Sequence, residues 1–409
     1  MQYIDDIPLV VEELPNTRRS WRIALVTETY PPEVNGVANT VAKVVEGLRS
    51  HNHTVQLVRP SQGQIERAGV PDEVLTKGMA IPMYAHLRMG APSKGKLVKL
   101  WSMRRPDLVH IATEGPLGWS ALQAAIKLKL PVCSDFRTNF QAYSQHYGIG
   151  WLQKPIMAYL RKFHNRCHST MVPTEALRTQ LAAAGLDGLS VVARGVDTRF
   201  FSPEKRSQGL RERWGMAPDD VAVLHVGRLA PEKNLGVMLE AFERIKRQVP
   251  RARLVVVGDG PARAQMQASC PQAHFAGFQS GEALASHYAS GDMFLFPSLT
   301  ETYGNVTPEA MASGLAVVAF DDAAAGQLIT HQHNGLLAPK NDPSVFVSLA
   351  QELAADVSLR GRLGAGARAK VLDHGWGNIL RGIEDIYTLT MQRANAVQPA
   401  LLRPDFQLG

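Results

Sequence analysis

The 409-residue sequence has only three cysteines, Cys133, Cys167 and Cys270, and they are scattered along the chain. An odd number at such spacing makes no disulfide framework and no metal-ligand motif, which is typical of proteins of the reducing cytosol. No segment approaches the about 18 continuous apolar residues that a transmembrane helix needs. The first 20 residues are acidic and resemble neither a signal peptide nor a membrane span. We therefore expect a cytoplasmic protein, with at most a peripheral attachment to the inner face of the cell membrane.

Two common nucleotide-binding motifs are also missing. No G-x-x-x-x-G-K-[ST] occurs, which argues against a P-loop NTPase. A dinucleotide-binding G-x-G-x-x-G should lie in the first strand-to-helix turn, but the loop there, PPEVNGV, contains only Gly36. The pair Gly258 and Gly260 lies in mid-chain and has Arg263 where the third glycine belongs. A nicotinamide or flavin enzyme is therefore disfavoured.

The net charge of +7 is unevenly distributed. Residues 21–200 contain 22 Lys and Arg against 12 Asp and Glu, whereas residues 201–409 contain 20 against 21. The basic surplus of the first half indicates an anionic partner there. Nucleic acid is disfavoured as that partner, because the sequence has neither aromatic interleaving nor a recognised binding module.

The length suggests two domains, because single cores stop growing at about 250–300 residues. Short apolar runs alternate with helical patterns from WRIALV onward, and the rhythm restarts at VAVLHVGR. This predicts an α/β fold with two successive parallel sheets, each covered on both faces. We place an N-terminal extension at residues 1–20, a first domain at 21–197 and a second at 198–375, and we expect residues 376–409 to cross back onto the first.

Ligands of such sheets bind at the carboxyl ends of the strands, so the loops there carry the chemistry. The loop HVGRLAPEKN places Arg228 and Lys233 after a strand, and two cations beside backbone amides suit a diphosphate. A solvated surface loop is the alternative for this segment taken alone. Two more loops, around Gly258 and Gly304, follow strands of the same half.

The stretch FLFPSLTETYGNVTPEAMASGLAVVAF has two glutamates, Glu301 and Glu309, on either side of a strand-to-helix loop. We read Thr307 as the N-cap and Pro308 as the first helical residue. Glu309 could then simply compensate the helix dipole, and Glu301 could be an exposed loop acid. The functional alternative is that loop amides take a phosphate and both carboxylates accept hydrogen bonds from sugar hydroxyls, which fits a nucleotide diphosphate sugar.

Five segments in order, TETYPPEVNGV, ARGVDTRFFSP, VGRLAPEKNL, VGDGP and SLTETYGNVTPEAMASGLAVVA, resemble the family 4 retaining glycosyltransferases. The resemblance spans about residues 21–390. It implies the GT-B architecture, in which two Rossmann-like domains face each other across a cleft that binds the sugar donor.

The resemblance also implies roles for individual residues. Arg228 and Lys233 should bind the diphosphate, Glu309 the ribose, and Glu301 the donor sugar. Gly36 should let the backbone approach the phosphate from the first domain. The expected catalytic group is Glu301, Arg228, Lys233 and His110, and the expected donor-binding group is Gly36, Gly258, Gly304, Asn305 and Glu309.

Members of this family transfer the sugar with retention, by front-face attack in which the leaving phosphate helps to deprotonate the acceptor. The sequence contains no D-x-D element. Charge on the leaving group should therefore be neutralised by Arg228, Lys233 and backbone amides. We expect no metal and no other cofactor, and the nucleotide sugar is a co-substrate.

Two positions depart from the family pattern. His110, the local candidate for a histidine near the donor sugar, lies inside an apolar run and could equally be a core residue. Close relatives usually have His where this chain has Arg137, which is permanently charged and cannot act as a base at neutral pH. Arg137 could instead bind an acidic acceptor or a phosphate. Acceptor-side candidates are Arg137, Asn139 and Tyr143.

The segments SKGKLVKLWSMRR and WLQKPIMAYLRKFHNRCHST carry nine Lys and Arg and no acid. They are either ordinary amphipathic helices or contacts with anionic lipid headgroups. The subgroup resemblance favours transfer of a hexose, mannose from GDP-mannose in the first place, to a lipid or glycan acceptor at the membrane surface. A UDP-sugar diacylglycerol glycosyltransferase is the alternative, and a GT-B nucleotide-sugar 2-epimerase is the rival class. The sequence does not choose the nucleobase.

Overall fold

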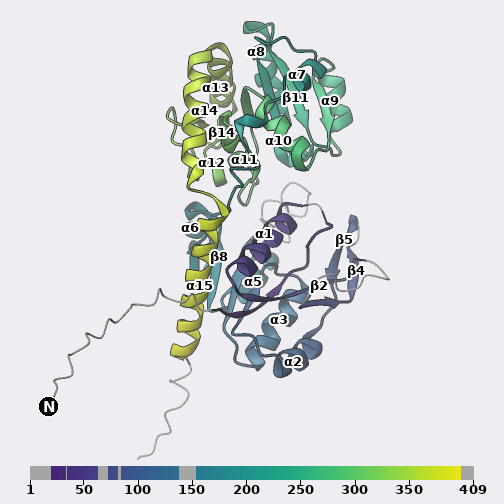
Figure 1. The fold of residues 1–409 in the computed structure, drawn as a ribbon, viewed down its shortest axis with the longest axis vertical. Coiled ribbons are helices and arrows are strands. Elements are labelled where there is room, and N and C mark those ends of the chain that lie inside the picture. Colours follow the sequence, from purple (N-terminus) through teal and green to yellow (C-terminus); the bar gives the residue numbers. More distant parts are fainter. Residues whose placement is uncertain (1–19, 34, 63–71, 82–83, 138–152, 398–409) are drawn as a thin grey trace, which may run out of the picture.

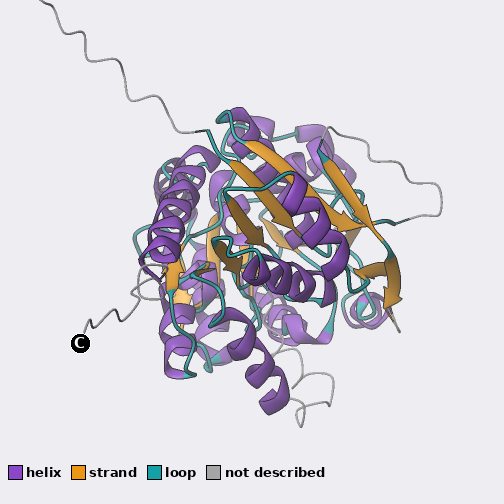
Figure 2. Cartoon of the chain, turned by 90° about the horizontal axis from the view of Figure 1, so that it is seen from below, coloured by secondary structure: helices purple, strands orange, loops and turns teal. Residues whose placement is uncertain are grey.

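A computed structural model of the chain describes residues 20–33, 35–62, 72–81, 84–137 and 153–397. They form two lobes stacked along the long axis of the molecule, each built on a parallel β-sheet (Figure 1). In the view from below, helices lie on both sides of the strands (Figure 2). The predicted α/β fold with two Rossmann-like units is confirmed.

The first lobe has a seven-stranded sheet in the order β3-β2-β1-β6-β7-β8-β9, in which all neighbouring strands are parallel. Its strands are β1 (Arg22–Val26), β2 (Thr54–Pro60), β3 (Glu73–Thr76), β6 (Leu108–Ile111), β7 (Val132–Asp135), β8 (Ser169–Val172) and β9 (Leu189–Val191). Its helices are α1 (Gly36–Ser50), α2 (Lys94–Met103), α3 (Pro116–Lys127), α5 (Gln153–His164) and α6 (Glu175–Ala183). An antiparallel ribbon of β4 (Gly78–Ile81) and β5 (Tyr84–Gly90) lies beside the sheet.

The second lobe has a six-stranded parallel sheet in the order β12-β11-β10-β13-β14-β15. Its strands are β10 (Ala222–Val226), β11 (Arg253–Val257), β12 (His274–Gly277), β13 (Met293–Phe296), β14 (Ala316–Phe320) and β15 (Leu336–Ala338). Its helices are α7 (Gln208–Arg213), α8 (Leu235–Gln248), α9 (Arg263–Ser269), α10 (Gly281–Ser290), α11 (Val306–Ala312), α12 (Ala323–Leu328), α13 (Pro343–Ala355) and α14 (Val357–Leu372). Two 3₁₀ turns, η2 (Pro203–Lys205) and η3 (Pro231–Lys233), precede α7 and α8.

The central strands are buried on both faces. All four residues of β6 and of β13 are buried, and so are all five of β10 and β14. Apolar clusters fill both sides of each sheet. Continuous apolar strands therefore reflect helical cover on both faces, as the sequence predicted.

The lobes are joined by two chain segments that run side by side. Val196, on the way out of the first lobe, forms a bridge with Gly375, and its amide donates to the carbonyl of His374 at 3.1 Å. The last helix, α15 (Trp376–Val397), then runs along the first lobe and packs against α1, β7 and β8 (Figure 1, yellow). None of the described helices is long and apolar enough to cross a membrane.

Candidate active site

The crevice of the second lobe lies where the direction of strand addition reverses. Strand β10 has β11 on one side and β13 on the other, so the loops after β10 and β13 diverge at the carboxyl edge of the sheet. Such a reversal is the usual ligand-binding position in open α/β sheets. Arg228 and Lys233 lie in the first loop and Glu301 in the second. The predicted loops therefore meet at one place.

Lys233 and Glu301 form an ion pair across this crevice. The hydroxyl of Ser298 donates to the same carboxylate oxygen of Glu301 at 2.8 Å. Both charged side chains are mostly buried, with 12% and 17% of their side-chain surface exposed. Lys233 is the last residue of η3, the 3₁₀ turn that begins at Pro231. Glu301 is thus a fixed hydrogen-bond acceptor beside a cation, and it is not an exposed loop acid.

Arg228 is held by Glu232, a residue that the sequence reasoning did not single out. The two form an ion pair, and the Glu232 side chain is 1% exposed. The Thr300 hydroxyl donates to the backbone carbonyl of Glu232 at 3.1 Å, which joins the two loops again. A carboxylate four residues after the arginine, next to a proline, was the signal that could have revealed this anchor.

Gly258 and Gly304, the two glycines predicted in these loops, are required by the backbone for different reasons. Gly258 has a φ of +136°, and a Cβ there would lie 1.9 Å from the carbonyl oxygen of Gly227. Gly304 has a φ of +87° and bends the chain between Glu301 and α11. Both conformations favour glycine. Their direct contact with a donor stays a prediction.

Helix α11 begins earlier than the sequence predicted. Its first residue is Val306 and its N-cap residue is Asn305, so Thr307 is inside the helix and not at its N-cap. The Asn305 side chain makes no capping hydrogen bond and accepts one from Arg194 at 3.4 Å. Its Nδ2 atom lies 3.7 Å from the position that a Cβ on Gly36 would occupy. Asn305 and Gly36 therefore face each other across the cleft between the lobes.

Glu309 has its own partner on α10. The hydroxyl of Tyr288 donates to the Glu309 carboxylate at 2.9 Å. Burial raises the pKa of Glu309 to about 7, and the hydrogen bond from Tyr288 offsets only part of that rise. Because this carboxylate is half-buried and hydrogen-bonded to a tyrosine from another helix, compensation of the α11 dipole does not account for its surroundings.

A cavity of about 480 Å³ lies between the lobes beside Glu309 and Asn305. The first lobe contributes residues of α1, and the second contributes the loop after β12, where Phe278 is 60% exposed and is followed by Gln279. None of the candidate residues from the sequence lies in this loop. The strand ends at Gly277, which leaves Phe278 on the wall of the cavity.

His110 does not reach the cleft. It lies on β6 with none of its surface exposed, and both ring nitrogens are engaged: Nδ1 lies 2.8 Å from the Tyr387 hydroxyl and Nε2 lies 2.9 Å from Asp135. In this geometry the His110 side chain has no access to a ligand in the cleft, contrary to the catalytic contact that we expected. The residue is a core histidine that holds Asp135 and α15.

Arg137 follows β7 and forms an ion pair with Asp135, at 2.5 Å from Nη2 and 2.7 Å from Nε. Burial alone would raise the pKa of Asp135, but the charges of Arg137 and His110 lower it to about 2. Arg137 lines a small cavity beneath α15 together with Arg194, which the sequence reasoning quoted in ARGVDT without giving it a role. Asn139 and Tyr143, the other acceptor-side candidates, lie outside the described residues.

The described part of the chain contains no group of three or more His, Cys, Asp or Glu side chains placed to hold a metal ion. The cations near the crevice are Arg228 and Lys233, each paired with a carboxylate. Two Rossmann-like lobes, a carboxylate–cation pair where the strand order of the second lobe reverses, and a cavity between the lobes are together the features of the GT-B class of glycosyltransferases.

Comparison with known proteins agrees with this class and specifies the family. Residues 34–200 match the family model described as Glycosyltransferase Family 4, and residues 220–356 match the one described as Glycosyl transferases group 1. The chain belongs to the family 4 glycosyltransferases, and it is an enzyme that transfers a sugar.

Two relatives and one solved structure show how far the similarity extends. A GDP-mannose-dependent alpha-mannosyltransferase of Mycobacterium tuberculosis is 35% identical over 369 residues, which covers 87% of this chain and 93% of the relative. A phosphatidyl-myo-inositol mannosyltransferase of the same species is 28% identical, covering 89% and 96%. The crystal structure of Anabaena Alr3699/HepE in complex with UDP superposes with a TM-score of 0.73 at 18% identity, covering 90% of this chain and 99% of that one, which supports the fold alone.

Proposed function

We propose that this glycosyltransferase transfers a mannosyl group from GDP-mannose, with retention, to a hydroxyl group of a lipid acceptor at a membrane surface. The 35% identity to a GDP-mannose-dependent enzyme supports the donor, and the similarity to a phosphatidyl-myo-inositol mannosyltransferase supports the acceptor class. The observation that carries the proposal is the Lys233–Glu301 pair, which sets a cation suited to diphosphate beside a carboxylate suited to sugar hydroxyls.

In this proposal the donor spans the crevice of the second lobe. Arg228 and Lys233 bind the diphosphate, Glu301 accepts hydrogen bonds from the sugar, and Glu309 accepts them from the ribose. The loop at Phe278 and Gln279 borders the same cavity as Glu309, and we place the nucleobase beside it. Gly36 and Asn305 close the cleft on the phosphate side.

The reaction needs no covalent enzyme intermediate. The acceptor oxygen forms a bond to the anomeric carbon while the bond from that carbon to the β-phosphate oxygen breaks on the same face, so configuration is retained. The proton of the acceptor hydroxyl passes to the leaving phosphate, and GDP departs. Arg228 and Lys233 stabilise the negative charge that develops on the diphosphate.

A lipid acceptor is supported by the surface of the first lobe. Leu160 and Phe163 of α5 are buried in their own domain, so the apolar stripe of this helix is not available to enter a membrane. The exposed face is basic, and Lys162 lies 5.9 Å from the centre of the Trp119 ring. Trp119 and Tyr159 line an apolar cavity of about 470 Å³ beside it. Cations around an apolar hollow suit an amphiphilic, anionic molecule.

A donor screen tests the transfer reaction. Thermal shift with GDP- and UDP-sugars should give the largest stabilisation with GDP-mannose, because a ligand that binds only the folded state raises its stability. Release of GDP should then require added lipid, and product mass should rise by one hexose. Nucleotide release, or a changed sugar, without any acceptor would point to a 2-epimerase.

Vesicle flotation tests the acceptor side. The protein should float with vesicles of phosphatidylglycerol and phosphatidylcholine at low salt and much less at high salt, because surface charges are screened. Replacing Lys162 and Arg161 by glutamate should reduce flotation, whereas the same exchange at Arg244 and Arg247 of α8, on the other lobe, should not. Equal behaviour of the two pairs, or no binding at low salt, would favour a soluble glycan acceptor.

A further inference from the structure

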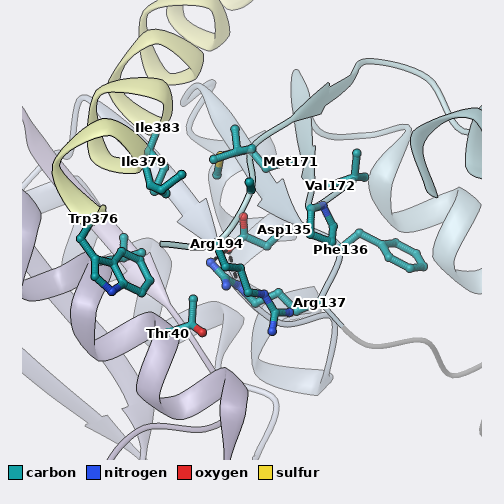
Figure 3. Close-up of a pocket in the computed structure, with 14 residues that line it drawn as sticks. Thr40, Asp135, Phe136, Arg137, Met171, Val172, Arg194, Trp376, Ile379 and Ile383 are labelled. Carbon is teal, nitrogen blue, oxygen red and sulfur yellow. Dashed lines mark hydrogen bonds and ion pairs between the residues drawn. The ribbon is translucent and has the colours of Figure 1, made fainter. Parts of the chain in front are cut away.

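Two arginines of the first lobe meet in a small cavity at the junction of the lobes. Arg137 follows β7 and Arg194 belongs to the segment that leads out of the first lobe, and their side chains point into the same space beneath α15 (Figure 3). The cavity measures about 30 Å³, which is room for about two water molecules, so it fits one compact group and neither a sugar nor a base. Thr40 of α1 and Trp376 of α15 border both this cavity and the larger one beside Glu309.

The charges around this cavity do not balance. Both arginine side chains are largely buried, with Arg194 9% exposed, and the carboxylate that lines the cavity with them is Asp135. The charge of Glu301 also acts on Arg194, but that carboxylate is paired with Lys233. The Asp135 carboxylate is paired with Arg137 and with His110. Burial first, and then the neighbouring charge of Arg137, lower the pKa of Arg194 to about 10, so it remains a cation at neutral pH. Two guanidinium groups against one carboxylate leave a buried positive charge, which is costly unless an anion joins it.

Arg194 contacts neighbouring residues, but these contacts leave most of the N–H donors of its guanidinium group without a hydrogen-bond acceptor among the described residues. Its guanidinium lies 5.7 Å from the centre of the Tyr303 ring, and the Tyr303 hydroxyl donates to its backbone carbonyl at 3.2 Å. Among the described residues its side chain makes a single hydrogen bond, to Asn305 at 3.4 Å, which is long for a charged donor with five N–H groups. Tyr303 and Asn305 both belong to the loop between Glu301 and Glu309. Arg194 is therefore aimed at the donor loop from the opposite lobe.

We propose that Arg137 and Arg194 together bind a phosphate group at the junction of the lobes. This inference rests on the proposed sugar transfer and adds a binding site to it. A guanidinium pair can present parallel N–H donors to two phosphate oxygens, and the negative charge of a phosphate would neutralise the surplus positive charge. The phosphate belongs either to the nucleoside diphosphate of the donor or to an acceptor that carries a phosphate ester. Both sources present a phosphate group to the arginines. They differ because the donor phosphate is part of GDP, whereas the acceptor phosphate binds in addition to GDP.

Calorimetric titration of the full-length protein separates the two sources. The titrants are GDP, GMP, which lacks the second phosphate, and sn-glycerol 1-phosphate added to the GDP-saturated protein. The variants are Arg194→Gln and Arg194→Lys, which keeps the charge but not the planar fork. The matched control is Arg178→Gln on α6, an exposed arginine of the same lobe that is paired with Glu175. Melting curves establish whether each variant is folded. If Arg194→Gln does not fold, the titrations are made with Arg194→Lys.

Each outcome decides the proposal. If the pair binds the donor, the Arg194 variants weaken GDP binding by at least about tenfold and leave GMP unchanged. If it binds the acceptor, GDP is unchanged and binding of glycerol 1-phosphate is lost. Unchanged affinity for all three titrants in a folded variant overturns the site. A wild-type protein that binds no nucleotide contradicts the proposed function instead, and the glycerol 1-phosphate titration still tests the arginine pair.

Discussion

The two sheets reverse their strand order in the same way but use the resulting crevices differently. In the first lobe the crevice between β1 and β6 is filled by the chain itself: the Glu28 carboxylate accepts from the amides of Gly90, Leu117 and Gly118, the last two at 2.8 and 3.4 Å. In the second lobe the crevice between β10 and β13 is lined by the Lys233–Glu301 pair. One lobe has closed its ligand position, and the other has kept charged groups there.

This difference explains why a helix start alone does not identify a nucleotide site. The first turn of α3 offers amides of the kind that bind phosphate in dinucleotide-binding domains. In this chain Glu28 takes those amides, and a Cβ on Gly115 would lie 2.3 Å from its carboxylate. A phosphate could not occupy the same place.

The largest effect is expected at the open crevice. Glu301→Ala removes the carboxylate that we assign to the donor sugar, and Arg228→Ala removes charge stabilisation of the leaving diphosphate. Each should lower kcat/KM by about 100- to 1,000-fold without changing the melting temperature by more than a few degrees. Steady-state assays of GDP release measure this. Glu240→Gln, an exposed carboxylate on α8, is the control, and near wild-type rates in both crevice variants would sink the site assignment.

At the closed crevice the effect should fall on stability. Glu28→Ala leaves three backbone N–H groups without their acceptor and should lower the free energy of unfolding by about 3 kcal/mol. Affinity for GDP should change less than twofold if the variant is folded, because we propose that the donor binds the other lobe. Urea unfolding and calorimetry measure the two quantities. Lost GDP affinity with unchanged stability would mean that the first crevice also receives the ligand.

The sequence predicted the strands that line the crevices better than those at the sheet edges. Strands β6, β10, β13 and β14 are continuous apolar runs, and that pattern is strong because each is covered on both faces. The edge strands β3, β9 and β15 were not predicted, and neither was the ribbon of β4 and β5. The three edge strands have only three or four residues and are partly exposed, so an alternating pattern is too short to be recognised.

Site residues were predicted where one loop carried the signal and missed where two distant segments had to meet. Lys233 and Glu301 each follow a strand, and their proximity comes from the strand order. The partners Asp135 of His110 and Asn305 of Arg194 come from elements 25 and 111 residues away. A local sequence pattern cannot predict contacts between residues so far apart in the chain. For His110 the sequence left a core role and a catalytic role open, and Tyr387, the partner of its Nδ1 atom, lies 277 residues later in the chain.

A smaller effect is expected from pH, through Glu309. Its pKa of about 7 lies above the ordinary 4.5, so at pH 6 most of the group is protonated and cannot accept two ribose hydrogen bonds. GDP affinity should be about tenfold weaker at pH 6 than at pH 8. The stability contribution has the opposite sign: it is full below about pH 4.5 and is lost as pH rises through about 7. Titrations of Glu309→Gln should show neither dependence, whereas Glu282→Gln, an exposed acid on α10, should keep both.

The smallest effect is expected from metal removal, and it concerns the cations of the open crevice. If Arg228 and Lys233 neutralise the negative charge that develops on the leaving diphosphate, as we propose, a divalent ion is not required for that purpose. Activity after dialysis against EDTA should stay within about twofold of the untreated enzyme, as should activity after Mg²⁺ or Mn²⁺ is added back. In Arg228→Ala, by contrast, added Mg²⁺ should recover part of the lost rate, because it can supply the missing positive charge. Loss of wild-type activity in EDTA with recovery in Mg²⁺ would show that the two basic side chains are insufficient.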